Sequence, residues 1–291
     1  MVKKLKKFFK KVLTKTLNGC IISTVKQREE LIKMKIDKRK NYYVILDTET
    51  TASCTPEENI QRSVMQKLVY DLGYTIATKT ETIIKRNYLV KEIYENNDLM
   101  DNAYFNSKRP MYAEMVANNQ VEVKPFAEII KIMQNDIAET GAKFFGAYNV
   151  GFDLDALMQT TNFIYPNTFK MFFKKTASGK FAPDTIKFCQ TYLFRKELEI
   201  IDLWTMACQT LCCQKTFQVF YLEETKRGNI KSNAEIVYNY IEDLDGEFAE
   251  DHTALSDSII ETKILQRILR IRKTLETKFA FLPYRLIKRV V

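Results

Sequence analysis

The chain has 291 residues, of which 46% are hydrophobic and 28% charged, a composition that excludes a disordered or low-complexity protein. No stretch reaches about 18 uninterrupted apolar residues, so no membrane-spanning helix is expected. The formal net charge of +9 is uneven, because residues 1–40 hold 14 Lys or Arg against three acidic residues while the rest is nearly neutral. We therefore expect a polyanionic partner to contact the N-terminal region.

Residues 1–40 form a basic N-terminal arm that opens with the pattern of an amphipathic helix. Its start resembles a signal peptide, but Lys15 interrupts the apolar stretch and no small-residue cleavage site follows, so we expect the arm to be retained. Three interpretations remain open: a helix packed on the body of the protein, a contact with nucleic acid, and a contact with a membrane surface. The apolar positions of the pattern are Leu5, Phe8, Phe9, Val12, Leu13 and Leu17.

Strand patterns begin at Asn41. The run "YYVILDTET" is apolar, β-branched and aromatic, which predicts a strand buried on both faces. The runs "LVYDLGYTIAT" and "ETIIKRNYLV" follow, and the polar junction near Lys79 predicts a hairpin between them. Residues 91–125 are polar and irregular, and we interpret them as an insertion or a lid.

Helices and strands alternate after this insertion. A helix is predicted over residues 125–141, then the strand "KFFGAYN" leads into a helix at "FDLDALM", and the strand "LEIIDLW" leads into the helix "TMACQTLCC". The run "SNAE" has the spacing of a capping box, from Ser232 to Glu235, and predicts the start of another helix. A long helix is expected over about residues 253–277.

This order predicts an α/β fold with a mixed five-stranded sheet and helices on both faces. We expect one domain over residues 41–275, with the basic arm before it and a basic tail over residues 276–291 after it. The six cysteines have no repeating spacing, which favours free thiols in a reducing compartment and a cytoplasmic location. Cys208 and Cys212 lie one helical turn apart without a second Cys or His pair, so buried thiols are expected there rather than zinc.

Three clusters of acidic residues follow apolar elements, the place where open α/β sheets carry their sites. The first is "DTET", in which Asp47 and Glu49 are two residues apart on an extended chain, so their side chains leave the same face. Two close carboxylates repel each other unless a group such as a divalent cation neutralises them. By itself the pair is equally compatible with a solvated strand end.

The second cluster is "NVGFDLDAL". Asp153 stands at the start of a predicted helix, where the helix dipole favours an anion, so it is either a metal ligand or a capping acid. Asp155 is the alternative ligand, but its position favours a solvent-facing role.

The third cluster is "EDHTALSDS", which contains the single histidine of the chain. Residues five apart on one helix point about 140° away from each other, so His252 and Asp257 can meet only if His252 precedes the helix or sits in its first turn. By itself a lone histidine is more often structural than catalytic.

The three clusters together predict an oxygen-rich site for two Mg²⁺ or Mn²⁺ ions. Two such ions about 4 Å apart suit the displacement of a phosphodiester. A neutral His252 beside them can take a proton from the attacking water.

The motifs "DTET", "NVGFD" and "HTALSD", in this order, resemble the DEDDh 3′-to-5′ exonucleases, the proofreading-subunit-like branch of the ribonuclease H-like superfamily. The resemblance spans about residues 41–270 and rests on the three motifs together, which are far more specific than any one of them. The H-x-A-x-x-D form of the third motif separates this branch from the one that uses tyrosine there. The stretch before and through this motif also resembles exonucleases encoded by phages of low-GC hosts, which would act in the host cytoplasm.

The resemblance implies roles for eight residues. Asp47, Glu49 and Asp257 would hold one ion, and Asp47 would bridge to a second ion supported by Asp153. His252 would be the general base. The implied substrate-binding residues are Thr50 on the terminal nucleotide, Asn149, which fixes the local turn, and Phe152, for which core packing is the alternative.

From these motifs we predict hydrolysis at the 3′ end of single-stranded or frayed DNA, with release of 5′-mononucleotides. An RNA or oligonucleotide substrate is the first alternative, and a nucleic-acid-binding assembly protein that keeps an exonuclease fold is the second. A DNA polymerase or replication complex is a candidate partner. The insertion and the arm exceed a minimal exonuclease domain and leave the choice of substrate open.

Overall fold

The computed structural model describes residues 36–37, 39–51, 67–101, 103, 106–166, 187, 189–194, 197–244, 248–249, 251–272, 279–280 and 282–289. The chain divides into two units, Met1–Arg39 and Lys40–Val291, and nearly all described residues belong to the second. The amphipathic helix expected in the N-terminal arm lies outside the described residues. Within the described ranges, no helix combines the length and the apolar content needed to cross a bilayer.

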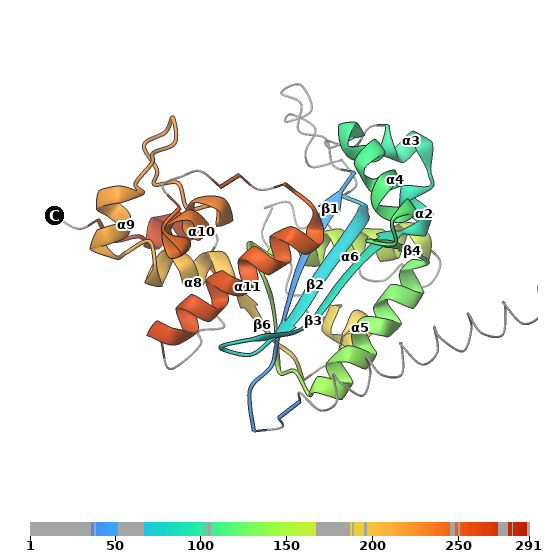
Figure 1. Cartoon of the computed structure of the whole chain (residues 1–291), viewed down its shortest axis with the longest axis horizontal. Coiled ribbons are helices and arrows are strands. Elements are labelled where there is room, and N and C mark those ends of the chain that lie inside the picture. The colour runs from blue at the N-terminus through green and yellow to red at the C-terminus, as the bar shows by residue number, and fades with distance from the viewer. Residues whose placement is uncertain are drawn as a thin grey trace, which may run out of the picture. The chain divides into compact units, whose positions relative to one another are not determined.

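A six-stranded mixed sheet forms the centre of the second unit, in the order β4-β3-β2-β1-β5-β6 (Figure 1). β1 pairs antiparallel with β2 and parallel with β5; β2 pairs antiparallel with β3; and the outer pairs β3–β4 and β5–β6 are parallel. The strands are β1 (Tyr43–Thr50), β2 (Val69–Ala77), β3 (Thr82–Val90), β4 (Glu122–Lys124), β5 (Phe144–Ala147) and β6 (Glu199–Asp202).

The α/β class and all five expected strands are confirmed, but the expected number of strands is wrong. The sixth strand, β4, is three residues long and lies at the sheet edge, inside the segment 91–125 that was interpreted as irregular. The same segment also contains short helices. Three residues are too few to show a strand periodicity, and β4 exists because it pairs with β3, a contact between segments that the local sequence does not record.

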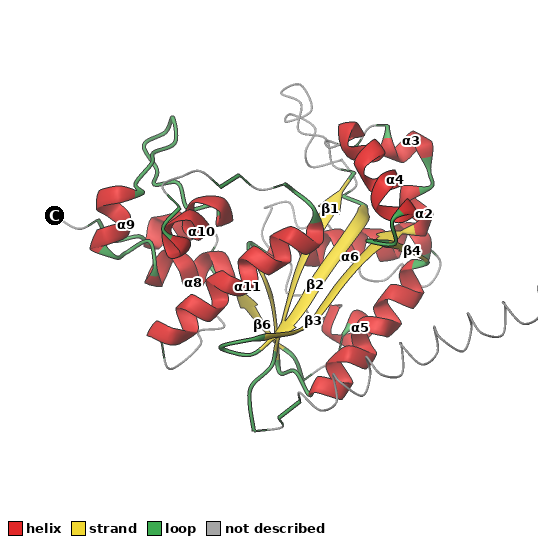
Figure 2. Cartoon of the chain, viewed as in Figure 1, coloured by secondary structure: helices red, strands yellow, loops and turns green. Residues whose placement is uncertain are grey.

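Helices cover the sheet (Figure 2). They are α2 (Lys91–Tyr94), α3 (Asn97–Met100), α4 (Arg109–Ala117), α5 (Phe126–Thr140), α6 (Val150–Ile164), α8 (Leu203–Thr210), α9 (Lys215–Phe220), α10 (Ala234–Glu242) and α11 (Ala254–Ile271). Short turns of other helix types are η2 (Asn106–Lys108), η3 (Cys189–Leu193) and η4 (Pro283–Leu286). α11 runs across β1 and β2, as Figure 1 shows, and α6 contacts β1 and β5.

Successive side chains of β1 point to opposite faces of the sheet. Tyr43 and Ile45 join a buried cluster that includes Ile260 and Ile264 of α11, so the odd-numbered residues of β1 face that helix. Thr48, on the opposite face, donates a hydrogen bond to a residue of α6. The sheet is therefore buried from both sides, and Asp47 and Glu49 continue the face that α11 covers.

Two predicted helix boundaries have different outcomes. α5 ends where expected, because Gly141 adopts the left-handed conformation, with φ of 67°, that commonly terminates a helix. The capping box from Ser232 to Glu235 is wrong, because α10 begins at Ala234 with Asn233 as its N-cap. The Ser232 hydroxyl instead accepts a hydrogen bond from Nε1 of Trp204 at 2.9 Å, a tertiary contact that removes it from the cap.

Candidate active site

The first two predicted ligands lie at the carboxyl end of β1. Asp47 and Glu49 are partly buried and project toward the side of the sheet covered by α11, as the two-residue period requires. The cross-strand partner of Asp47 on β2 is Gly73. The pair of carboxylates therefore sits where the start of α11 crosses the sheet.

Gly73 lets α11 approach the sheet closely. A Cβ atom at this position would lie 2.1 Å from the backbone nitrogen of Leu255 and 2.2 Å from the carbonyl carbon of Ala254. The first turn of α11 therefore rests directly on the backbone of β2, in space that any side chain would occupy. This close approach brings Asp257, in that first turn, to the carboxylates of β1.

His252 lies two residues before α11, which confirms the geometry required for it to meet Asp257. Its Nδ1 atom is 4.0 Å from Oδ2 of Asp257, and its side chain is 42% exposed. Its φ of 50° is left-handed, a conformation that costs a residue with a side chain on the order of 1 to 3 kcal/mol. One ligand atom each from Glu49, His252 and Asp257 lie within 4.8 Å of one another.

Asp153 approaches from the other face of the sheet. It lies in the first turn of α6, is 2% exposed, and accepts a hydrogen bond from Oγ1 of Thr48 at 2.8 Å. Neither Asp153 nor Asp47 belongs to the group of Glu49, His252 and Asp257 that meets the 4.8 Å limit in the described part of the chain. The negative charge of Asp153 nevertheless raises the pKa values of Asp47 and Glu49, so the four carboxylates act on one another.

The three predicted substrate-binding residues differ in accessibility. Thr50 is 7% exposed, so little of its side chain is available to a ligand. Asn149 is left-handed, with φ of 69°, and its backbone N–H donates to Asp202 at 3.1 Å, in agreement with a turn-forming role. Phe152 is partly buried, and the ammonium of Lys67 lies 4.6 Å from the centre of its ring.

Asp155, the alternative ligand of the second cluster, is turned to the outside of the site. Its side chain is 34% exposed and forms an ion pair of 3.5 Å with Lys67. It also accepts a hydrogen bond from Gln159 at 2.8 Å. These contacts agree with the solvent-facing role expected for it.

Burial and mutual repulsion raise the pKa values of the clustered carboxyl groups. Burial, followed by the charges of Asp71 and Asp257, raises the pKa of Glu49 to about 9. The pKa of Asp47 is raised well above its ordinary value by burial, then by the charge of Glu261, and then by the other ligands. Burial also raises the pKa of Asp153. Without a cation, simultaneous ionisation of all these carboxyl groups is therefore unfavourable.

Sequence reasoning missed two buried acids of this site, Asp71 and Glu261, which are 0% and 3% exposed. Asp71 is the cross-strand partner of Glu49, and Glu261 lies one turn after Asp257 on α11. The spacing from Asp257 to Glu261 is a signal that could have been noticed, because residues four apart share a helix face. Asp71 had no comparable signal, since only the strand register places it opposite Glu49.

The donor set fits a divalent cation. Carboxylate oxygens dominate it and a single imidazole joins them, a combination that suits Mg²⁺ or Mn²⁺ better than zinc. A cation bound by Asp47, Glu49, Asp153 and Asp257 would also relieve the repulsion that raises their pKa values.

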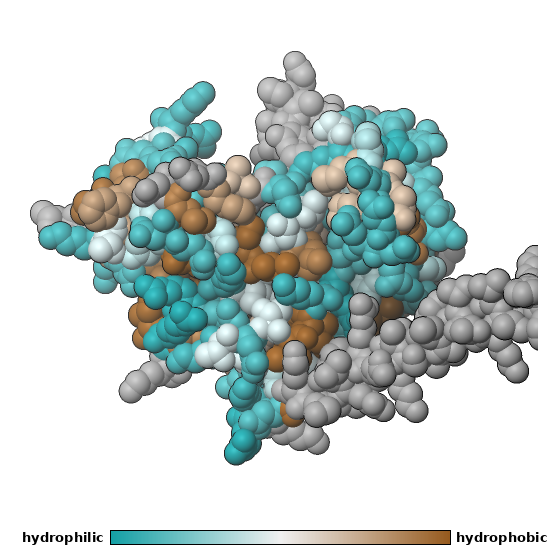
Figure 3. Space-filling view, viewed as in Figure 1, coloured by the Kyte–Doolittle hydropathy of each residue, from teal (hydrophilic) through white to brown (hydrophobic). Residues whose placement is uncertain are grey.

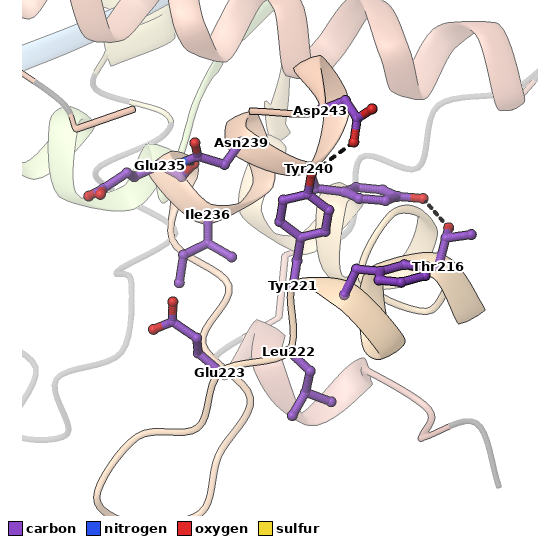
Figure 4. A pocket seen from close by; sticks show the side chains of 10 residues that line it. Thr216, Tyr221, Leu222, Glu223, Glu235, Ile236, Asn239, Tyr240 and Asp243 are labelled. Carbon is purple, nitrogen blue, oxygen red and sulfur yellow. Dashed lines mark hydrogen bonds between the residues drawn. The ribbon is translucent and has the colours of Figure 1, made fainter. Parts of the chain in front are cut away.

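A pocket of about 630 Å³ lies elsewhere, between α9, α10 and the segment that joins them (Figure 4). Tyr221 donates to Asp243 and Thr216 bonds to Tyr240 across it, at 3.1 and 2.6 Å. None of the predicted site residues lines this pocket. Hydrophobic side chains are also exposed on α9 (Figure 3), where Phe220 is 77% exposed.

Comparison with models of known protein families gives no match, and comparison with curated proteins finds no relative.

Proposed function

We propose that this protein is a metal-dependent 3′-to-5′ exonuclease of the DEDDh type on a ribonuclease H-like fold. Its substrate would be the 3′ end of single-stranded or frayed DNA, and its product a 5′-mononucleotide. The observation that carries the proposal is the convergence of Glu49, His252 and Asp257, with ligand atoms within 4.8 Å of one another although two motifs far apart in the sequence supply them.

The surrounding fold supports the proposal. The mixed six-stranded sheet with helices on it is compatible with an α/β nuclease fold. The three motifs occupy the end of β1, the first turn of α6 and the start of α11, the positions that the motif resemblance requires. The carboxylates of all three motifs are close enough to raise one another's pKa values, which supports the proposal.

Asp47, Glu49, Asp153 and Asp257 would hold the divalent cations. Bound there, the cations would supply charge stabilisation for the pentacovalent transition state and would favour deprotonation of the attacking water. By holding the cations at fixed positions, these carboxylates would orient the scissile phosphate. Asp153 and Asp257 are buried, at 2% and 9% exposed, which limits the access of bulk water to them.

His252 would accept the proton of the attacking water. Burial, followed by the positive charge of Lys108, lowers its pKa, so the neutral imidazole is the dominant form at neutral pH. Nδ1 is the nitrogen near Asp257, which leaves Nε2 to take the proton. The water oxygen bonds to phosphorus, and the bond from phosphorus to the 3′ oxygen of the preceding nucleotide breaks. That oxygen then takes a proton from solvent.

The proposal is tested with purified full-length protein on matched DNA and RNA strands that carry a 5′ label, with and without Mg²⁺. We expect stepwise shortening from the 3′ end of DNA and release of 5′-mononucleotides. Turnover of RNA alone would assign the substrate to the first alternative. Asp47→Asn should abolish turnover and retain binding of the strand, and a variant that still cleaves would contradict the assigned site.

A further inference from the structure

The segment that leads into α4 reaches the stretch of chain that carries His252. Lys108, the last residue of η2, is partly buried, and its ammonium donates hydrogen bonds to the backbone carbonyls of Asp251 and His252, the second at 3.2 Å. These two carbonyls belong to consecutive residues. A single cation, contributed by the segment 91–125, therefore restrains the backbone of the predicted general base.

A second link fastens the other end of the same stretch. Tyr112, four residues after Lys108 and therefore on the same side of α4, is fully buried and donates to Oδ2 of Asp71 at 2.8 Å. The same Oδ2 atom accepts the backbone N–H of Ala254 at 3.0 Å. The chain around His252 is thus held at the carbonyls of Asp251 and His252 and, two residues later, at the N–H of Ala254.

The backbone of His252 is the part of this stretch that most requires support. Its left-handed φ of 50° is rare for a residue with a side chain. The imidazole is 42% exposed, so packing alone does not fix its position. A charged donor to two adjacent carbonyls is a stronger restraint than a neutral hydrogen bond, because charge-assisted hydrogen bonds are roughly twice as strong.

We propose that Lys108 is a positioning residue, which holds the backbone of His252 so that the imidazole stays beside Asp257. The hydrogen bonds of Lys108 and the link from Tyr112 through Asp71 to Ala254 together form what we call the brace. The proposal rests on the proposed nuclease function for the role of His252, but the brace itself is a property of the fold. The brace also gives the segment 91–125 a function, because α4 supports the loop that carries His252.

The single histidine of the chain makes the brace directly observable. Protein labelled with ¹³C at histidine Cε1 gives one signal, from His252, without any assignment step. In the wild-type protein with Mg²⁺ we expect one sharp peak. At a pH well above the histidine pKa, where loss of the Lys108 charge does not change the protonation of His252, we expect a broadened peak or several peaks in Lys108→Met, because the imidazole samples more than one position. In Lys108→Arg, which keeps a cationic donor, we expect a single peak again.

Kinetics on a labelled DNA strand provide the second measurement. Misplacing a catalytic group by about 1 Å can cost up to about 100-fold in rate, so Lys108→Met should lower kcat by about 10- to 100-fold with KM changed by less than about twofold. Lys108→Arg should recover at least part of the loss. If Lys108 bound a substrate phosphate instead, Lys108→Met would raise KM and leave the His252 signal unchanged, which would overturn the proposal.

The neighbouring cation Arg109 is the matched control. It donates to Asp101 and to Asn97, both at 2.6 Å and both within its own segment. Arg109→Met should therefore leave the His252 signal and kcat near the wild-type values. An unchanged signal and an unchanged kcat in Lys108→Met would overturn the brace. If the wild-type protein cleaves no nucleic acid, the nuclease proposal fails while the histidine signal still decides whether Lys108 holds the loop.

Discussion

Gly73 on β2 is the cross-strand partner of Asp47, and the space above Gly73 is filled by the backbone of Ala254 and Leu255 at the start of α11. A residue without a side chain thus stands directly beside a predicted metal ligand. Its role is to let a helix rest on the sheet at that point. The distance between the first and third motifs is set by this contact.

Gly73→Ala should therefore damage the site more than an ordinary glycine substitution. The added Cβ would lie 2.1 Å from backbone, which cannot move as a side chain can, so α11 must shift away from β1. We expect a stability loss of about 3 kcal/mol or more, since overpacking a core typically costs 1–3 kcal/mol. Chemical denaturation measures the loss, and isothermal titration with Mn²⁺ should show weakened binding.

Gly141→Ala is the control for this prediction. Gly141 is also a special position, with φ of 67°, but it lies at the end of α5 and a Cβ there meets no atom within 4 Å. The substitution should lower stability by about 1 kcal/mol through backbone strain and leave Mn²⁺ affinity unchanged. Equal loss of Mn²⁺ binding in both variants would show that general destabilisation, not the position of α11, governs the site.

Glu49→Gln should stabilise the metal-free protein at neutral and alkaline pH. The pKa of Glu49 is raised to about 9, so the folded state binds a proton that the unfolded state releases from about pH 4.5 upward. The free energy of unfolding therefore falls as pH rises between these two values, and is highest below the lower one. Gln removes this dependence, and thermal unfolding in EDTA from pH 5 to pH 9 measures it.

Addition of Mg²⁺ should make the wild-type protein more stable than Glu49→Gln, the reverse of the order expected in EDTA. The ion binds the carboxylate form and stabilises the wild-type protein through its affinity for the folded state, whereas Glu49→Gln loses a ligand and gains less. A wild-type protein whose unfolding temperature in EDTA does not change from pH 5 to pH 9 would argue against the raised pKa. Equal Mg²⁺ stabilisation of both proteins would remove Glu49 from the ligand set.

The acidic limb of the pH–rate profile should report His252. Burial, then the charge of Lys108, lowers its pKa, so the neutral form required of a base persists below the ordinary histidine value of about 6.5. Activity should rise with pH through an inflection below that value and be lost at lower pH. His252→Gln should lower kcat by about 10² to 10⁴ and abolish this limb. An unchanged inflection in the variant would assign it to another group.

Arg86 should be important for stability although it lies away from the site. Its guanidinium donates to both carboxylate oxygens of Asp136, at 2.9 and 3.1 Å, and Tyr74 donates to the same group at 2.7 Å. Asp136 is 5% exposed, so Arg86→Met leaves a buried carboxylate without its cation and should cost about 3 kcal/mol. Lys124→Met, which removes more exposed ion pairs, should cost less than about 1 kcal/mol. Urea denaturation compares the two variants.

The basic arm should supply much of the electrostatic attraction to nucleic acid. Removal of residues 1–28, which hold most of its lysines, reduces the number of phosphates that the protein can neutralise. The plot of log affinity for single-stranded DNA against log salt concentration should therefore become less steep. Fluorescence anisotropy at several salt concentrations measures the slope. A slope that does not change would assign the arm a structural role.

The sequence by itself determined the local geometry of the strands and of the site motifs. The two-residue period of β1 places Asp47 and Glu49 on one face, and the five longer strands show their own patterns. The helical angle lets His252 meet Asp257 only from before the helix or from its first turn. These features depend on neighbours within a few residues, and therefore on rules of local geometry.

Only the tertiary structure decided which residues from distant parts of the chain lie beside these site residues. The strand register brings Asp71 opposite Glu49, and the pairing with β3 makes a strand of Glu122–Lys124. The folding of segment 91–125 brings Lys108 to the backbone carbonyls of Asp251 and His252. Each is a contact between segments far apart in the chain. No local pattern encodes such a contact, because its free energy arises from burial and hydrogen bonding that exist only after the chain has folded.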